Sequence, residues 1–207
     1  MLSSIKNSVV AIKDNDEAIA RWVSHVISPH VVGVVMTALF AFTYSDDPLK
    51  TLLWLAVLVP LLIVPPMAYI MWQVHKGTLE DIYMPRRETR TRPLIVMMVW
   101  LLICLNLIQY WGAPQIVVTF IIMSLLLVAI LSVVTLFWKI SFHGATISAA
   151  ATATVFMGGL LALPVILLVP LVGWSRIRLL RHTPRQVIYG SLVGASIALI
   201  MVQGILE

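Results

Sequence analysis

Charged side chains are scarce in this chain. Only 11% of its 207 residues are Asp, Glu, Lys or Arg, whereas ordinary soluble domains carry about 25% charged residues. Hydrophobic residues make up 60% of the sequence, and the mean hydropathy is +1.00. This composition excludes a soluble globular domain and predicts an all-α, polytopic transmembrane helical bundle.

Cysteine is almost absent, and several common catalytic motifs are missing. Cys104 is the only cysteine and lies in an apolar run, which excludes a disulfide framework within the chain and a CxxC metal site. The sequence contains no HExxH, DxxD pair, P-loop or GxSxG motif, so metal, nucleotide and serine-esterase chemistry have no support. We therefore expect neither a metal nor another cofactor. Residues 1–21 lack the succession of charged, apolar and small residues that marks a cleavable signal peptide, so we expect the first span to insert as its own signal.

Long apolar runs are abundant instead. We count seven candidate spans, one of them short. They lie at about residues 30–45, 51–74, 94–111, 115–138, 145–162, 163–174 and 187–206. The second contains Pro60, Pro65 and Pro66, which should kink or split it because proline removes a backbone donor. The sixth rises only about 18 Å as a helix, so it either continues through residues 175–180 or lies in a recess below the membrane surface.

The N-terminal segment has an amphipathic pattern. Between residues 15 and 27, one helical face carries apolar side chains, namely Ile19, Trp22, Val23, Val26 and Ile27. The other face carries polar side chains, namely Asp16, Glu17, Arg21 and Ser24. This stripe is typical of a helix lying in the membrane interface, and equally of a helix docked on the surface of the bundle. We therefore divide the chain into an amphipathic segment, residues 1–28, and a membrane-embedded helical domain, residues 29–207.

Positive residues are distributed unevenly over the predicted topology. The segments 76–92, 139–144 and 175–186 are separated by two crossings each, so all three face the same side. Of the 14 lysines and arginines, only Lys50 falls on the opposite face. Because positive residues tend to stay inside, this basic face is predicted to be cytoplasmic, in the cell (inner) membrane, with the C-terminus outside. Arginines that bind a substrate anion would inflate this count.

Three basic segments on that face carry the chemically useful side chains. They are residues 76–93 with four arginines, 139–144 with one histidine, and 173–186 with further arginines and a second histidine. Taken singly, each is compatible with a solvated loop, a structural histidine or a cytosolic anchor. Together they supply the groups that phosphoryl transfer needs. Arginine forks match phosphate oxygens, one histidine can attack phosphorus, and a second can protonate the leaving alkoxide.

Two short patterns within these segments indicate a family. Ser175 and Arg176 are followed after five residues by His182, and Ser141 is followed two residues later by His143. The first pattern matches the third motif, Ser-Arg-x5-His, of the type 2 phosphatidic acid phosphatase superfamily. The second resembles its Pro-Ser-Gly-His motif at two of four places. This superfamily comprises membrane relatives of vanadium haloperoxidases and glucose-6-phosphatase.

The remaining motif is closer to a variant branch of that superfamily. The family's first motif, Lys-x6-Arg-Pro, is matched at Arg92 and the proline after it, whereas Pro85 stands at the lysine position. Asp81 followed by Arg87 and Arg90 resembles a branch that also carries Lys-Ile-Ser-x-His and His-Thr-x-x-Gln.

The resemblance covers about residues 76–195 and implies a role for each matched residue. His182 would be the nucleophile that forms a phosphohistidine, and His143 would be the general acid. The phosphate cradle would comprise Arg176, Ser175, Ser141, Arg92, Arg90 and Arg87. At Gln186 the family usually has an aspartate that orients and charges the nucleophilic histidine, and a glutamine supplies the orientation without the charge.

Gln186 also has a position that can be predicted from local sequence. Thr183 and Pro184 are expected to start the last helix, since proline is favoured in a first turn. If that helix includes His182, the amide oxygen of Gln186 lies on the same face and can accept a hydrogen bond from the imidazole. This bond would determine which ring nitrogen is left to attack.

These features predict hydrolysis of a lipid or isoprenoid phosphomonoester or diphosphate. The expected partners are membrane lipids and that substrate, with no nucleic acid. The alternative is a phosphatase-like subunit without turnover that serves assembly or lipid binding in a membrane complex, and a homo-oligomer is also open. A third possibility, an intramembrane prenyltransferase, depends on residues 90–94 following Asp81. Prenyl transfer needs a divalent ion, whereas histidine phosphatase chemistry should persist in chelator.

Overall fold

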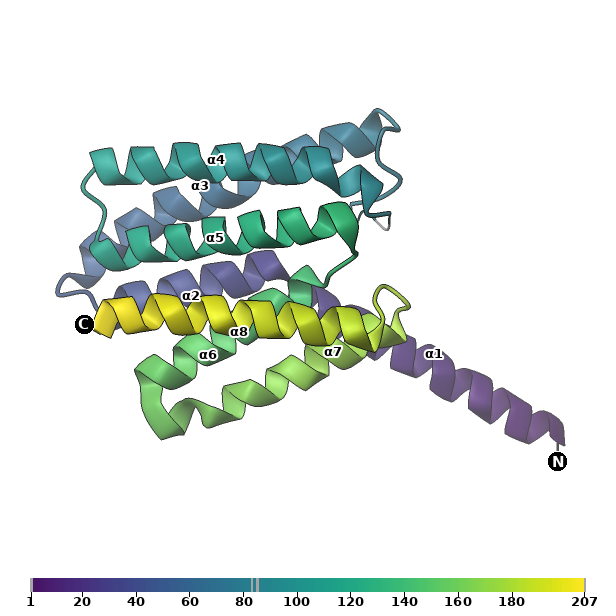
Figure 1. Ribbon diagram of the computed structural model, residues 1–207. Helices are drawn as coiled ribbons and strands as arrows, with labels where there is room; N and C mark the ends of the chain where they lie inside the picture. The colour runs from purple at the N-terminus through teal and green to yellow at the C-terminus, as the bar shows by residue number, and fades with distance from the viewer. Residues whose placement is uncertain (1, 83, 85, 207) are drawn as a thin grey trace.

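The computed structural model describes residues 2–82, 84 and 86–206, and within these ranges it describes the side chains of residues 14–203. All regular elements in this part of the chain are helices (Figure 1). In chain order they are α1 (Leu2–Val26), α2 (Pro29–Thr43), α3 (Pro48–His75), the 3-10 helix η1 (Glu88–Arg90), α4 (Thr91–Tyr110), α5 (Gln115–Phe137), α6 (Phe142–Gly158), the 3-10 helix η2 (Gly159–Leu167), α7 (Leu168–Arg178) and α8 (Pro184–Leu206).

The length and composition of these helices agree with the predicted all-α membrane bundle. In the described residues, five helical stretches are long and apolar enough to cross a membrane. The number becomes six if α1 and α2, which are bent by 45° at their junction, form one span. One of the five stretches, Phe142–Arg178, contains α6, η2 and α7. Figure 1 shows that the chain reverses direction at η2, so that α6 and α7 lie side by side.

The connections alternate between the two ends of the bundle (Figure 1). The loops after α3, α5 and α7 lie at one end, and α1 extends outward from that same end. The turns after α2 and α4, together with η2, lie at the other end. The three basic segments of the sequence are therefore neighbours at one end of the molecule.

Two glycines let α8 pack tightly against α6. A Cβ atom on Gly194 would lie 1.9 Å from the carbonyl oxygen of Ala145, and one on Gly190 would lie 2.5 Å from the carbonyl oxygen of Ser141. Larger residues at these positions would push the helices apart. The close approach allows the backbone N–H of Ser141 to donate to the carbonyl oxygen of Gln186 at 3.2 Å. This hydrogen bond therefore joins the segment that contains His143 to the segment that contains His182.

The prolines of α3 do not split this helix, which runs continuously over Pro48–His75. Pro65 has no N–H to donate to the carbonyl of Leu61, four residues earlier. The indole N–H of Trp100, on α4, donates to that carbonyl at 2.8 Å instead. A side chain from the neighbouring helix thus satisfies the backbone group that the proline leaves open.

The N-terminal helix docks on the bundle with a face that differs from the predicted one. Val23 and Ser24 are buried, and α1 packs against α7. Ile19, Trp22 and Val26, predicted to share the apolar face with Val23, are 45%, 65% and 44% exposed. The assignment of Ser24 to the solvated face is wrong, because this residue meets a buried arginine on α7. The three exposed apolar residues remain available to lipid.

Candidate active site

The end of α7 places His182 over the helix that carries Arg176. After Arg178 the chain turns through Leu180, whose φ is 54°. The backbone N–H groups of Arg181 and His182 both donate to the carbonyl oxygen of Arg176, at 3.0 and 3.2 Å. This turn satisfies the end of the helix, and it leaves the side chains of Arg176 and His182 only 5% and 8% exposed.

A capping box at the start of α8 orients the ring of His182. The N–H of Gln186 donates to the hydroxyl oxygen of Thr183 at 3.4 Å, and the N–H of Thr183 donates to Oε1 of Gln186 at 3.1 Å. This reciprocal pair is a standard way to begin a helix. The predicted start of the last helix at Thr183 and Pro184 agrees with α8, but His182 precedes the helix instead of belonging to it.

The same amide oxygen also bonds to the imidazole. Nδ1 of His182 lies 3.2 Å from Oε1 of Gln186. The N–H of Thr183 can only donate, so the Gln186 atom that it meets must be the oxygen. Nδ1 therefore carries the hydrogen, and Nε2 of the neutral ring keeps its lone pair.

The surroundings of His182 favour its neutral form. Burial, and then the positive charges of Arg176 and Arg90, lower the pKa of His182 to about 3. The hydrogen bond that His182 donates to Gln186 opposes this shift, and the charge of Lys139 adds to it. At neutral pH the imidazole is therefore uncharged and carries a nucleophilic nitrogen.

Arg176 lies at the centre of the remaining polar groups. Its Nη1 donates to the hydroxyl oxygen of Ser24 at 2.5 Å. His143, in the first turn of α6, lies close to the main chain of Ser24 and to the side chains of Arg176 and His182. The two histidines predicted for the site are thus brought together, with a guanidinium beside both of them.

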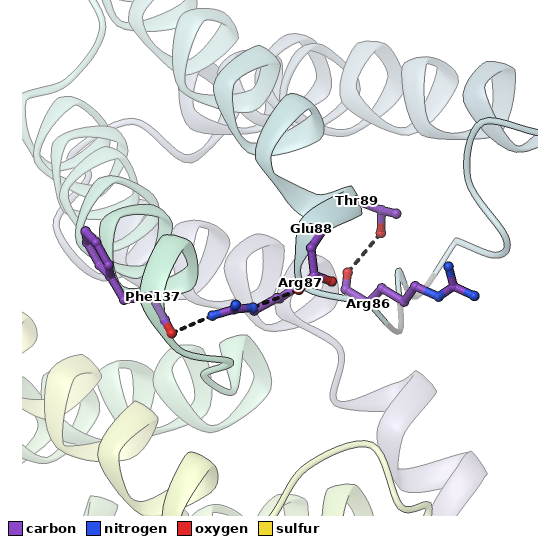
Figure 2. Close-up of polar contacts among 5 residues, drawn as sticks. All are labelled: Arg86, Arg87, Glu88, Thr89 and Phe137. Carbon is purple, nitrogen blue, oxygen red and sulfur yellow. Dashed lines mark hydrogen bonds and ion pairs between the residues drawn. The ribbon is translucent and has the colours of Figure 1, made fainter.

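The segment before α4 contributes Arg90 to this group. Arg90 is 8% exposed, its Nε donates to the carbonyl oxygen of Met84 at 2.8 Å, and its charge acts on His182. Arg87 is directed elsewhere, as Figure 2 shows: Nη1 donates to the carbonyl oxygen of Phe137 at the end of α5, and Nε pairs with Glu88 at 2.8 Å. Arg92 is exposed on α4.

The two serines of the predicted cradle are wholly buried. The hydroxyl of Ser141 caps α6 by accepting from the N–H of Gly144 at 3.2 Å. The hydroxyl of Ser175 donates to the carbonyl oxygen of Val172 in its own helix at 2.8 Å. Both therefore support the local backbone at the site. Within the described residues, no three His, Cys, Asp or Glu side chains are grouped so that they could hold a metal ion.

Two side chains near the site were not among the predicted site residues. Ser24 comes from the N-terminal helix, and Lys139 immediately precedes α6 and lies near Arg176 and His182. Lys139 could have been singled out as the lysine of the Lys-Ile-Ser-x-His pattern, whereas no local pattern marks Ser24. Comparison with known proteins finds no family model, no curated protein and no solved structure that matches the chain.

Proposed function

We propose that this protein is an integral membrane phosphatase that hydrolyses a lipid or isoprenoid phosphomonoester or diphosphate through a phosphohistidine at His182. The observation that supports it most is the state of His182. Its ring is buried beside Arg176, held at Nδ1 by Gln186 and kept neutral, which leaves Nε2 as a nucleophile. Such an arrangement is expected of a nucleophilic histidine.

In the first proposed step, the lone pair of Nε2 on His182 forms a bond to phosphorus. The phosphorus–oxygen bond to the leaving group breaks, and the leaving oxygen takes a proton from His143. Arg176 and Arg90 stabilise the negative charge on the nonbridging oxygens. The bound phosphate brings negative charge next to His143, which favours the protonated form that a general acid requires.

In the second step, water attacks the phosphohistidine. The nitrogen–phosphorus bond breaks and its electron pair returns to Nε2, while the now neutral His143 accepts the proton from water. One water molecule is consumed, and inorganic phosphate and the dephosphorylated lipid are released. Both histidines return to their starting states.

The membrane setting supports a lipid substrate. We propose seven crossings, made by α2 to α8, of which the sixth, α7, is short, and a cytoplasmic basic end in the cell inner membrane. A phosphate group at that end would lie at headgroup depth while its tail stays among the helices in the bilayer. The exposed face of α1, with Ile19, Trp22 and Val26, would lie in the interface.

The experiment is hydrolysis of a panel of lipid phosphates and diphosphates by the purified full-length protein, with chelator present. We expect phosphate release, and acid-labile labelling of the protein by a substrate carrying a radioactive phosphoryl group. His182→Gln should abolish both, whereas His75→Gln, at the end of α3 and away from the site, should retain both. Release that requires a divalent ion, or labelling that survives His182→Gln, would reject the mechanism.

The second candidate is a phosphatase-like subunit that binds lipid or assembles into a complex without turnover. The observation that favours it is that Gln186 has no negative charge, so the positive charge that the His182 ring gains when Nε2 bonds to phosphorus is poorly compensated. A protein that binds lipid phosphates, hydrolyses none of them and gains nothing from a carboxylate at position 186 would support this candidate.

A further inference from the structure

A cavity of about 370 Å³ opens between α1 and α7, beside the loop that carries His182. We call it the α1–α7 pocket. Its lining combines segments that are far apart in the sequence. The charged side chains of the lining are Arg21, Lys139, Arg176, Arg178, Arg181 and Glu17.

Positive charge exceeds negative charge in this pocket. Among the described residues, Glu17 is the one carboxylate of the lining, and it pairs with Arg178 at 3.7 Å and with Arg21 at 3.6 Å. Arg181 pairs with Asp81, which belongs to the loop after α3, at 3.6 Å. A single carboxylate between two arginines leaves the pocket with a net positive charge.

Lys139 concentrates that charge next to the reaction centre. It lies close enough to Arg90, Arg176 and Arg181 for all three to act on its ammonium group. In the described part of the chain, no carboxylate forms an ion pair with Lys139. Burial and these like charges lower the pKa of Lys139. Four neighbouring cations repel one another, and an anion placed among them would offset that repulsion.

The pocket adjoins the reaction centre on the side of the general acid. Arg176 lines the pocket and also acts on His182. Ser24 lines the pocket, accepts the hydrogen bond of Arg176, and has its main chain close to His143. His143 would deliver its proton to the leaving group, so whatever is attached to the leaving oxygen lies toward the pocket.

We propose that the α1–α7 pocket binds a second anionic group of the substrate, on the leaving side of the transferred phosphoryl group, and that Lys139 contacts it. This inference rests on the phosphatase function proposed above and selects the substrate class, a lipid diphosphate. His182 bonds to the terminal phosphorus, the bond from that phosphorus to the bridging oxygen breaks, and the bridging oxygen takes the proton of His143. Water then releases the terminal phosphate from His182, and the lipid monophosphate leaves the pocket.

Binding of methylenediphosphonate, a diphosphate analogue with an uncleavable bridge, tests the pocket without turnover. We expect calorimetry on the full-length protein in detergent to give an affinity about tenfold higher for this analogue than for inorganic phosphate, the equivalent of one added charge-assisted hydrogen bond. Lys139→Met should remove most of that preference. Lys76→Met is the matched control, because Lys76 lies at the same end of the bundle but over the ring of Trp72.

A substitution that should raise the affinity, where Lys139→Met should lower it, separates an effect on binding from a merely structural effect. Glu17→Gln removes the carboxylate of the lining and should raise the affinity for methylenediphosphonate about threefold. Glu80→Gln, which removes a carboxylate paired with Arg86 outside the pocket, should leave it unchanged. Equal affinity for the two ligands, or equal weakening of both by Lys139→Met, would overturn the proposal.

Turnover distinguishes this inference from the function on which it rests. The ratio of kcat/KM for farnesyl diphosphate to that for farnesyl phosphate should fall about tenfold in Lys139→Met. Hydrolysis without preference for the diphosphate, unchanged in ratio by Lys139→Met, would overturn the pocket assignment and keep the phosphatase. Selective binding of the diphosphonate without hydrolysis of any lipid phosphate would reject the phosphatase and keep the anion site.

Discussion

Arg176 on α7 donates a hydrogen bond from Nη1 to the hydroxyl of Ser24 on α1, a residue 152 positions earlier in the chain. Both residues are buried, at 5% and 4% exposure. The N-terminal helix therefore takes part in holding the central arginine of the candidate site. Its sequence pattern predicted only attachment to a surface.

Ser24→Ala should weaken phosphate binding and slow turnover, because Arg176 loses the partner that directs its guanidinium. We expect a rise in KM of about three- to tenfold and a loss of about 1 kcal/mol of stability, as for one hydrogen bond. Ser124→Ala is the matched control, since among the described residues that hydroxyl donates to the carbonyl of Phe120 in its own helix and to no other group. Equal kinetic effects of the two variants would contradict a positioning role for Ser24.

Gln186→Glu should raise turnover, because a carboxylate of the same reach keeps the bond to Nδ1 of His182 and compensates the imidazolium. Gln186→Asp is the substitution that the resemblance alone suggests. It should preserve turnover or raise it by less than Gln186→Glu does, because the Asp side chain is shorter by one methylene. Gln186→Met should lower turnover, and His182→Ala should abolish it. A Glu variant no faster than the wild type would count against the phosphohistidine.

Thr183→Ala separates the capping function of Gln186 from its contact with His182. It removes the acceptor of the Gln186 N–H but leaves the bond between Gln186 and the imidazole. We expect a loss of about 1 kcal/mol in stability, typical of a lost N-cap, with kcat nearly unchanged. A fall in kcat as large as that of Gln186→Met would mean that helix capping, and not the tautomer of His182, controls the rate.

The lowered pKa of His182 makes the folded state sensitive to acid. The ordinary histidine pKa is 6.5 and that of His182 is about 3, so between these values the unfolded chain binds a proton that the folded chain does not. The free energy of unfolding therefore falls as the pH drops from about 6.5 toward 3. Heat unfolding in detergent at about pH 7.5 and about pH 4.5 should show a smaller loss of stability for His182→Gln than for the wild type. An equal loss of stability in His182→Gln and in the wild type would contradict a neutral His182 ring in the folded state.

Trp100→Phe should destabilise the bundle by about 1 kcal/mol, because the carbonyl of Leu61 loses its donor. In a Pro65→Ala background the new N–H of residue 65 can bond to that carbonyl, so the same tryptophan substitution should cost less. Unfolding in detergent of the wild type, the two single variants and the double variant gives the coupling free energy between Trp100 and Pro65. Additive effects would show that the indole does not compensate for the proline.

Single cysteines at Asp47 and Arg86 test the proposed topology in a Cys104→Ala background. These exposed positions flank α3 at opposite ends, so an impermeant thiol reagent should label Asp47→Cys from outside intact cells and Arg86→Cys only after lysis. Labelling of both from outside would reverse the assignment of the basic end. The candidate site would then face outward.

Local features of this protein could be predicted from its sequence. The start of α8 at Thr183 and Pro184 depends on two residues three positions apart, Thr183 and Gln186, whose reciprocal hydrogen bonds are a standard way to begin a helix. The contact between Gln186 and His182 was also predicted, but it forms at the cap and not along the helix, because His182 precedes α8. The packing role of Gly190 and Gly194 is likewise evident in sequence, because small residues four apart leave a groove on any helix.

Only the tertiary structure decided which distant residues meet. Arg87 matched the predicted cradle but bonds to the end of α5, while Ser24 approaches Arg176 without a motif to mark it. Helices that are apolar on every side carry little periodicity to indicate which face turns inward. Composition therefore determined the helical membrane class, and local spacing determined the caps and glycine contacts. The neighbours of the buried arginine depended on how the helices pack.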